Sequence, residues 1–240
     1  MSSTPHQASN QRLAQLAGLL YFSMLPTTGI GYFSAQFLLA NGGVAAAAQI
    51  AVSRSYLEFG VLAGAVGFVT WLVVGVLFYQ LFRPVSDRAC KLLLVFVVAS
   101  VTLILAALAR RMDALSLVGQ SQLLGVGAEQ LRLLAALTMR SSDNLMQVSV
   151  IFWGLWLVPL GYLVYRSGFM PKTLGVLLVF GAPWYVAMFV GGVLEPDYLK
   201  TPFAQVMNYA FGIPEIVGEV GTGLWLMIRG TRGARSSAAS

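Results

Sequence analysis

The sequence is poor in charge, cysteine and histidine. Only 10% of its 240 residues are charged, whereas a soluble domain usually carries about a quarter. Cys90 is the only cysteine and His6 the only histidine, which excludes an internal disulfide, a Cys/His metal site and a Cys–His nucleophile. Phosphate loops, HExxH, nucleophile elbows and dinucleotide-binding fingerprints are also missing. We therefore expect no metal and no cofactor, and an enzyme built on this chain would have to depend on carboxylates.

Apolar residues are instead gathered in runs long enough to cross a bilayer. Hydrophobic residues make up 58% of the chain, and one helical span needs roughly 20 predominantly apolar residues. We predict six spans, at about Leu13–Tyr32 (which can run on to Ala40), Tyr56–Phe82, Ala89–Ala109, Asn144–Tyr165, Leu174–Leu194 and Tyr209–Ile228. The fold class is therefore all-α, a polytopic transmembrane helical bundle over residues 12–230, with polar tails at residues 1–11 and 231–240.

Two connections between the spans stand out. Asn41–Gly43 breaks the chain after the first span, and an alanine-rich piece follows at Val44–Val52. The longer connection, Arg110–Ser142, contains an amphipathic helix near Ala128–Met139. Its predicted apolar face holds Leu131, Leu134, Ala135 and Leu137. This outer helix either lies at the membrane interface or continues into the fourth span, as a packing helix or as a gating lid.

Basic residues predict the orientation of the spans. An even number of spans puts both ends on one side, with nine Lys or Arg residues: Arg12, Arg83, Arg88, Lys91, Arg166, Lys172, Arg229, Arg232 and Arg235. The other side holds six: Arg54, Arg110, Arg111, Arg132, Arg140 and Lys200. Cytoplasmic loops carry the excess of Lys and Arg, so we expect both termini in the cytoplasm and the protein in the bacterial inner membrane. The same rule explains the net charge of +6. We therefore expect the lipid bilayer as the partner, and no nucleic acid.

Glu215 and Glu219 are the leading candidates for function. They are four residues apart, so they share one face of the last span. Counting ten residues back from Arg229 gives about 15 Å of helix, which places Glu219 near the middle of a roughly 30 Å hydrocarbon core. A carboxylate at that depth costs several kcal/mol unless it is paired, neutralised or hydrated.

Hydroxyl side chains are expected at the same depth. Thr27, Thr28 and Ser100, together with Thr70 and Thr102, could line a polar pocket around the two glutamates. Two interpretations stay open. The pocket is either a proton-linked or cation-linked small-molecule site, or a structural contact in which a buried carboxyl bonds to hydroxyls and backbone and keeps the helices in register.

Four stretches of the sequence resemble one family. They are RLAQLAGLLYFSML at the start, LFYQLFRPV at the end of the second span, IFWGLWLVPLGYLVYRSGFMPKTLGVLL across the fourth and fifth spans, and IVGEVGTGLWLMIRG at the close. Over about Arg12–Gly230 the chain resembles the bacterial membrane proteins grouped as domain-of-unknown-function family 4386. The last stretch aligns Glu219 with the Gly-Glu of that family. Many members have a histidine near the start of the fourth span, where this chain has Ser141–Asn144.

The resemblance implies an all-helical membrane fold and no activity. The first functional hypothesis is a non-catalytic membrane bundle or accessory protein, whose helix faces dock an unidentified membrane-protein partner. The alternative is a small carrier, linked to protons or cations through Glu219 and Glu215. The sequence leaves the partner, the small ligand and the oligomeric state open.

Overall fold

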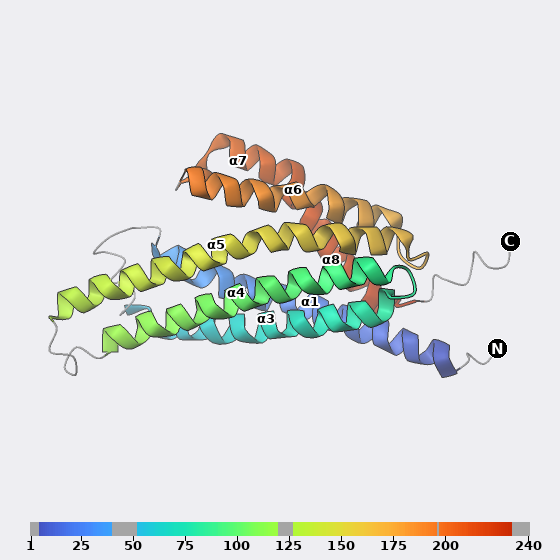
Figure 1. The fold of residues 1–240 in the computed structure, drawn as a ribbon, viewed down its shortest axis with the longest axis horizontal. Helices are drawn as coiled ribbons and strands as arrows, with labels where there is room; N and C mark the ends of the chain where they lie inside the picture. Colours follow the sequence, from blue (N-terminus) through green and yellow to red (C-terminus); the bar gives the residue numbers. More distant parts are fainter. Residues whose placement is uncertain (1–4, 40–51, 120–126, 196, 232–240) are drawn as a thin grey trace. The chain divides into compact units, whose positions relative to one another are not determined.

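The computed structural model describes residues 5–39, 52–119, 127–195 and 197–231 (Figure 1). The described elements are helices: α1 (Pro5–Leu39), α3 (Arg54–Phe82), α4 (Asp87–Gly119), α5 (Ala128–Arg166), α6 (Lys172–Leu194), the 3-10 helix η1 (Tyr198–Lys200), α7 (Pro202–Met207), the π-helix η2 (Asn208–Gly212) and α8 (Ile213–Ile228). The predicted break at Asn41–Gly43, the alanine-rich piece up to residue 51 and the C-terminal tail from residue 232 lie outside the described residues.

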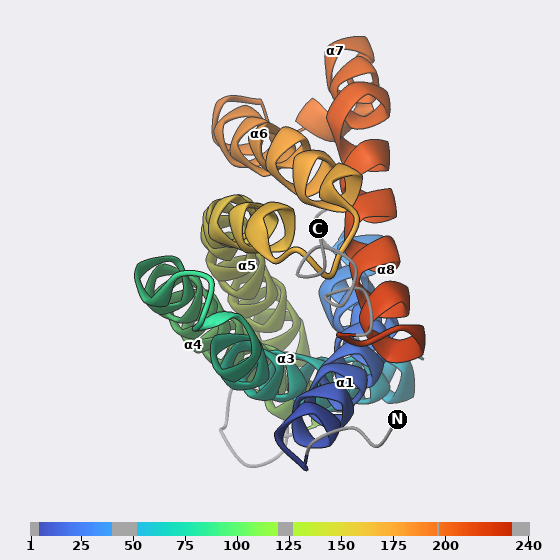
Figure 2. The ribbon, with the colours of Figure 1, turned by 90° about the vertical axis from the view of Figure 1, so that its right-hand side faces the viewer.

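The six predicted spans are confirmed. Six helical segments are long and apolar enough to cross a membrane. The sixth, Pro202–Ile228, combines α7, η2 and α8 into one continuous helical run (Figure 2). Several helices are longer than a span requires. The 39 residues of α5 extend over about 58 Å, well beyond a hydrocarbon core of roughly 30 Å. Such a helix must tilt or project from the bilayer.

The third span does not end at Arg110 and Arg111, as the sequence suggested. Helix α4 continues for two more turns to Gly119. The reason is the apolar stripe, which runs on past the arginines through the buried residues Ala114 and Leu115. Arg111 lies on that stripe and is fully buried, whereas Arg110 is exposed. The assignment of Arg111 to an exposed membrane edge was therefore wrong.

The predicted amphipathic helix near Ala128–Met139 exists, and it is continuous with the fourth span as the first part of α5. Its buried face was predicted only in part. Leu131 and Ala135 are buried as expected, together with Met139, but Leu134 and Leu137 are 47% and 64% exposed. The buried stripe follows a spacing of four residues. Leu134 directly precedes Ala135 and Leu137 lies two positions after it, so they are rotated by about 100° and 200° from Ala135.

The chain divides into two compact units, and α1, α3, α4 and α5 each contribute a part to both. The first unit comprises residues 1–23, 70–100 and 150–240. Its helices approach closely where glycine replaces a side chain. A Cβ atom at Gly161 of α5 would lie 2.6 Å from the Gly175 carbonyl of α6, and one at Gly221 of α8 would lie 2.6 Å from Leu174. Small residues allow this contact where no hydrophobic effect operates between helices.

The second unit comprises residues 24–69 and 101–149. Its core holds Ala35, Leu57, Ala114, Leu115, Ala135 and Met139. The Gly60-xxx-Gly64 motif of α3 packs inside this unit. Gly64 contacts Gly31 of α1, and Gly60 contacts Ser34. Helices α1 and α3 are therefore separated by little more than their backbones at this point.

Candidate functional site

Glu215 is the buried member of the carboxylate pair. It lies in the first turn of α8 and is only 2% exposed. Its side chain rests against α6 at Gly181, where any side chain would collide with it. Tyr185, one turn further along α6, interacts with its carboxyl group. Its Oε1 atom is buried and has no hydrogen-bond partner among the described residues.

Glu219 is the less buried member of the pair. It is half-buried, and the hydroxyl of Tyr21 on α1 donates a 2.9 Å hydrogen bond to its Oε1 atom. The Tyr21 side chain is fully buried. The carboxyl groups of Glu215 and Glu219 also lie within hydrogen-bonding range of each other. Two carboxylates offer only acceptors, so this contact becomes a hydrogen bond only when one of them carries a proton.

The start of α8 is irregular at this point. The π-helical turn Asn208–Gly212 comes directly before it, and Pro214 stands within its first two positions. Proline has no backbone N–H group, so it cannot donate to the carbonyl one turn earlier. Helix α6 also contains a proline, Pro183, two residues from Gly181. Single π-turns inside helices occur frequently at functional sites.

The predicted hydroxyl residues divide between the two units. Ser100 belongs to the first unit, is buried, and accepts a 3.0 Å hydrogen bond from the indole N–H of Trp153. Thr27 and Thr28 belong to the second unit. Both donate to the Met24 carbonyl of their own helix, each at 2.9 Å. The hydroxyl that reaches Glu219 from the first span is that of Tyr21.

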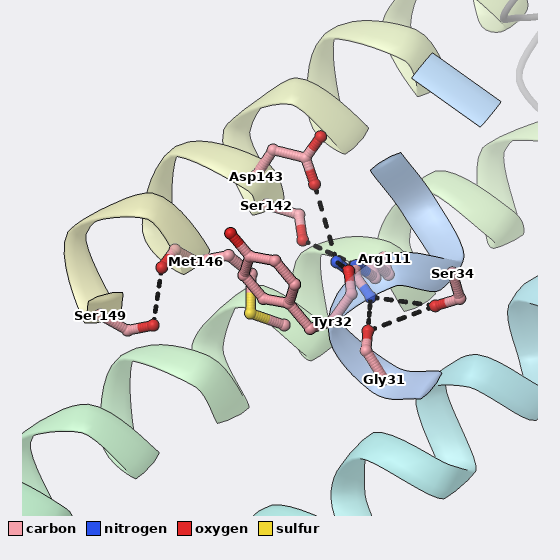
Figure 3. Close-up of polar contacts among 8 residues, drawn as sticks. All are labelled: Gly31, Tyr32, Ser34, Arg111, Ser142, Asp143, Met146 and Ser149. Carbon is pink, nitrogen blue, oxygen red and sulfur yellow. Dashed lines mark hydrogen bonds and ion pairs between the residues drawn. The ribbon is translucent and has the colours of Figure 1, made fainter. Parts of the chain in front are cut away.

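The second unit contains a polar centre of its own, around Arg111 of α4 (Figure 3). The guanidinium donates to the carbonyl of Gly31, to the hydroxyl of Ser34 at 3.3 Å and to the carbonyl of Tyr32 at 3.4 Å. These three residues belong to α1. From α5, the Ser142 hydroxyl accepts at 3.2 Å. The side chain of Arg111 is 0% exposed, and its partners come from two helices besides its own.

Asp143 supplies the counter-charge for Arg111. Its Oδ1 atom lies 3.6 Å from Arg111 Nη2, while its side chain is 25% exposed. Asp143 does not cap a helix, because α5 begins fifteen positions earlier in the chain, at Ala128. The arrangement as a whole ties α1, α4 and α5 together within the second unit.

Sequence reasoning missed Tyr21, Tyr185, Arg111 and Asp143. A signal existed for two of them. Arg111 lies three or four positions from Ala107 and Leu108 on one side and from Ala114 and Leu115 on the other. This helical spacing places it on the same buried face. Tyr21 follows Ala14 and Ala17 at helical spacing, and both are buried. Nothing in the local sequence of Tyr185 or Asp143 distinguishes them, because their roles depend on contacts with other helices.

The carboxylate pair is suited to holding one positive charge. Two carboxyl groups in contact, away from bulk water, repel each other strongly when both are ionised. A single proton or a single cation between them removes that repulsion. The Arg111 centre differs, because the guanidinium already has acceptors. Asp143 Oδ1 also lacks a hydrogen bond among the described residues, but it lies 3.6 Å from the positive charge of Arg111. Among the described residues, no group of three or more His, Cys, Asp or Glu side chains gathers in a way that could hold a metal ion.

Six apolar helices with a carboxylate pair in the last of them define a multi-pass α-helical membrane protein. The family model described as a domain of unknown function, DUF4386, matches residues 16–230, and the chain belongs to this family. It is also 26% identical, over 163 residues, to an uncharacterized protein of Archaeoglobus fulgidus. That match covers 67% of this chain and 77% of the relative. No solved structure matches the chain.

Proposed function

We propose that the protein is a small proton-linked carrier, in which Glu215 and Glu219 share one exchangeable proton. The observation that carries this proposal is the buried Glu215 Oε1 atom, which has no hydrogen-bond partner among the described residues. A purely structural carboxyl would be expected to have its bonds satisfied, because an unsatisfied buried acceptor costs about 1–3 kcal/mol. Glu219, half-buried beside it, gives the proton a way in and out.

The setting of the pair supports the same function. Residues 215 and 219 lie within the last span, where an ionisable side chain is a functional candidate by default. The π-turn Asn208–Gly212 and Pro214 weaken the regular hydrogen bonding just before the pair. A helix of this kind can adjust locally when the charge between the carboxyl groups changes.

The location proposed with this function is the bacterial inner membrane, with both termini in the cytoplasm. The basis is the bias of nine basic residues against six in the sequence. With Arg111 counted as buried rather than exposed, the second number becomes five, and the bias increases. Reporter fusions at the two ends should both give the cytoplasmic signal.

Infrared spectroscopy tests the shared proton directly. Purified protein in lipid would be titrated while the C=O stretch of protonated carboxylic acids is recorded. Wild type should show a protonated carboxyl band that persists when the exposed carboxylates have ionised. Glu215→Gln and Glu219→Gln should each remove or shift that band. Glu58→Gln is the matched control, because Glu58 is 46% exposed and pairs with Arg54 at 2.7 Å, and it should leave the band unchanged. A spectrum without such a band would refute the proposal.

A second function, that of an accessory protein, is favoured by one specific observation. Helices α5 and α6 form an apolar groove of about 490 Å³, lined by residues such as Leu155, Val158, Pro183 and Val186. A partner helix could pack there. Crosslinking from a cysteine at position 158 in whole membranes tests this function. An accessory function requires a discrete crosslinked adduct with another protein. Adducts with lipid alone would exclude that function.

A further inference from the structure

Five aromatic rings of the first unit form an unbroken series of edge-to-face contacts. Tyr21 contacts Trp156 at a centroid distance of 5.8 Å, and Trp156 contacts Trp71 at 5.2 Å. Trp71 contacts Trp153 at 6.3 Å, and Trp153 contacts Tyr185 at 5.9 Å. The rings come from α1, α3, α5 and α6. Such a set provides apolar surface together with negative ring faces that attract cations.

Both ends of this series meet the carboxylate pair. Tyr21 donates its hydrogen bond to Glu219, and Tyr185 interacts with Glu215. The rings are not all closed off, because Trp153 and Tyr185 are half-buried, as is Glu219. The site therefore combines negative charge, an unpartnered carboxyl oxygen on the 2% exposed Glu215, and aromatic surface that can be reached.

From this combination we infer that the carried ligand is an organic ammonium ion with apolar substituents, which binds between the carboxylate pair and the rings of Trp153 and Tyr185. The inference rests on the proposed function and names its substrate class. Aromatic rings near a negative charge are the recognition chemistry for alkylated ammonium groups. The cation takes the place of the shared proton as the single positive charge between the two carboxylates, so one proton leaves as one ligand arrives and the net charge of the site is unchanged.

A bare divalent metal ion fits the site less well. Calcium takes six to eight oxygen ligands and magnesium requires near-octahedral coordination. Among the described residues, no third Asp, Glu, His or Cys joins the two glutamates in a group that could hold a metal. An ammonium ion with apolar substituents needs fewer polar contacts, because the rings contact its carbon atoms.

An apolar groove adjoins the site and suits such a ligand. Gly154 and Ala182 line it, and a Cβ atom at Gly154 would lie only 3.1 Å from the Cβ atom of Tyr185. Its volume of about 490 Å³ is within the usual range for small-molecule sites. The lining side chains are apolar, so the groove offers hydrocarbon substituents a surface next to the helix turn that carries Tyr185.

Two probe molecules of the same shape separate charge from apolar fit. Benzyltrimethylammonium carries the cation, and neopentylbenzene has a carbon atom in place of its nitrogen. Binding of each to purified protein would be measured by calorimetry, and proton release would be followed in weakly buffered solution. We expect the cation to bind at least about tenfold more tightly than the neutral molecule, because charge pairing adds to ring contact. Equal affinities, or no binding of the cation, would overturn the inference.

Variants of Tyr185 and Glu219 then locate the cation. Tyr185→Phe keeps the ring and should retain binding within a few-fold. Tyr185→Leu removes the ring and should weaken binding by about tenfold. Glu219→Gln should abolish the preference for the cation over the neutral probe. If Tyr185→Phe weakens binding as much as Tyr185→Leu, the hydroxyl rather than the ring is responsible, and the ring site is refuted.

The two proposals can fail separately. If the infrared band is present but the cation does not bind, the shared proton stands and the ammonium site is wrong. If the cation binds with the expected preference but no shared proton is detected, the ammonium site stands and the proton-linked function is wrong. Each variant would first be checked for a monodisperse size-exclusion profile. Tyr185→Phe, which removes one oxygen atom, keeps the comparison usable if a larger change prevents folding.

Discussion

The two units differ in how they accommodate a buried ionisable side chain. Among the described residues, Glu215 in the first unit and Arg111 in the second are the least exposed ionisable side chains. The Arg111 guanidinium has acceptors from Gly31, Tyr32, Ser34 and Ser142. Glu215 has a carboxylate neighbour and an oxygen without a hydrogen bond.

This difference separates a structural polar group from one that is ready for a ligand. A satisfied buried charge holds helices in one arrangement, and removing it leaves other buried groups unpaired. A buried carboxyl group with one oxygen unpaired and a second carboxyl group beside it is poorly satisfied until a proton or a cation arrives. The comparison predicts that stability depends on Arg111, whereas ligand or proton binding depends on Glu215 and Glu219.

Arg111→Leu should have the largest effect on stability. It would leave the Gly31 and Tyr32 carbonyls without the guanidinium and Asp143 without its counter-charge. We expect a loss of about 3 kcal/mol or more, measured as a lower thermal midpoint in detergent. Arg110→Leu is the matched control, because the adjacent Arg110 side chain is 56% exposed. Equal effects of the two substitutions would remove the distinction between the units.

Asp143→Asn should have a smaller effect in the same assay. The ion pair with Arg111 is long, at 3.6 Å, and Asp143 is partly exposed. The asparagine keeps an oxygen in place, and Arg111 keeps its carbonyl and hydroxyl partners. We expect a loss of about 1–2 kcal/mol. A loss as large as that of Arg111→Leu would mean that the charge of Asp143, rather than the backbone carbonyls, holds Arg111.

Tyr21→Phe should cost about 1 kcal/mol, the net value of one buried hydrogen bond. The substitution removes the donor to Glu219 and retains the ring contacts with Phe78 and Trp156. Tyr162→Phe is the control, because Tyr162 is 46% exposed. The infrared band of the carboxylate pair should also shift in Tyr21→Phe. An unchanged band would show that Tyr21 does not contact the proton-bearing pair in the membrane.

The sequence predicted the helices far better than the site. Long apolar runs identify spans without any tertiary information, and each of the six predicted spans falls within a helical segment long and apolar enough to cross a membrane. Depth along a helix singled out Glu215 and Glu219, because distance from Arg229 can be counted. The residues that contact these two glutamates could not be identified from positions along the sequence. Tyr21 meets Glu219 across 198 positions of sequence, and only the packing of α1 against α8 brings them together.

Arg111 shows the limit of a rule that was otherwise sound. Paired arginines after an apolar run usually mark the edge of the membrane, and Arg110 fits that rule. The neighbouring Arg111 lies on a different face of the helix, because consecutive residues are rotated by about 100° around the helix axis. The apolar residues that follow it, Ala114 and Leu115, were the available sign that the buried face continues.

Glu215→Gln should have the smallest effect on stability and a large effect on binding. The amide keeps the shape of the side chain against Gly181, removes the repulsion with Glu219, and can donate a hydrogen bond to it. We expect a thermal midpoint equal to wild type or slightly higher, because the repulsion between two neighbouring carboxyl groups is removed. The same variant should lose the shared-proton band. If Glu215→Gln instead destabilises the protein as strongly as Arg111→Leu, then Glu215 is a structural residue, and the contrast between a satisfied and an unsatisfied buried charge fails at its central point.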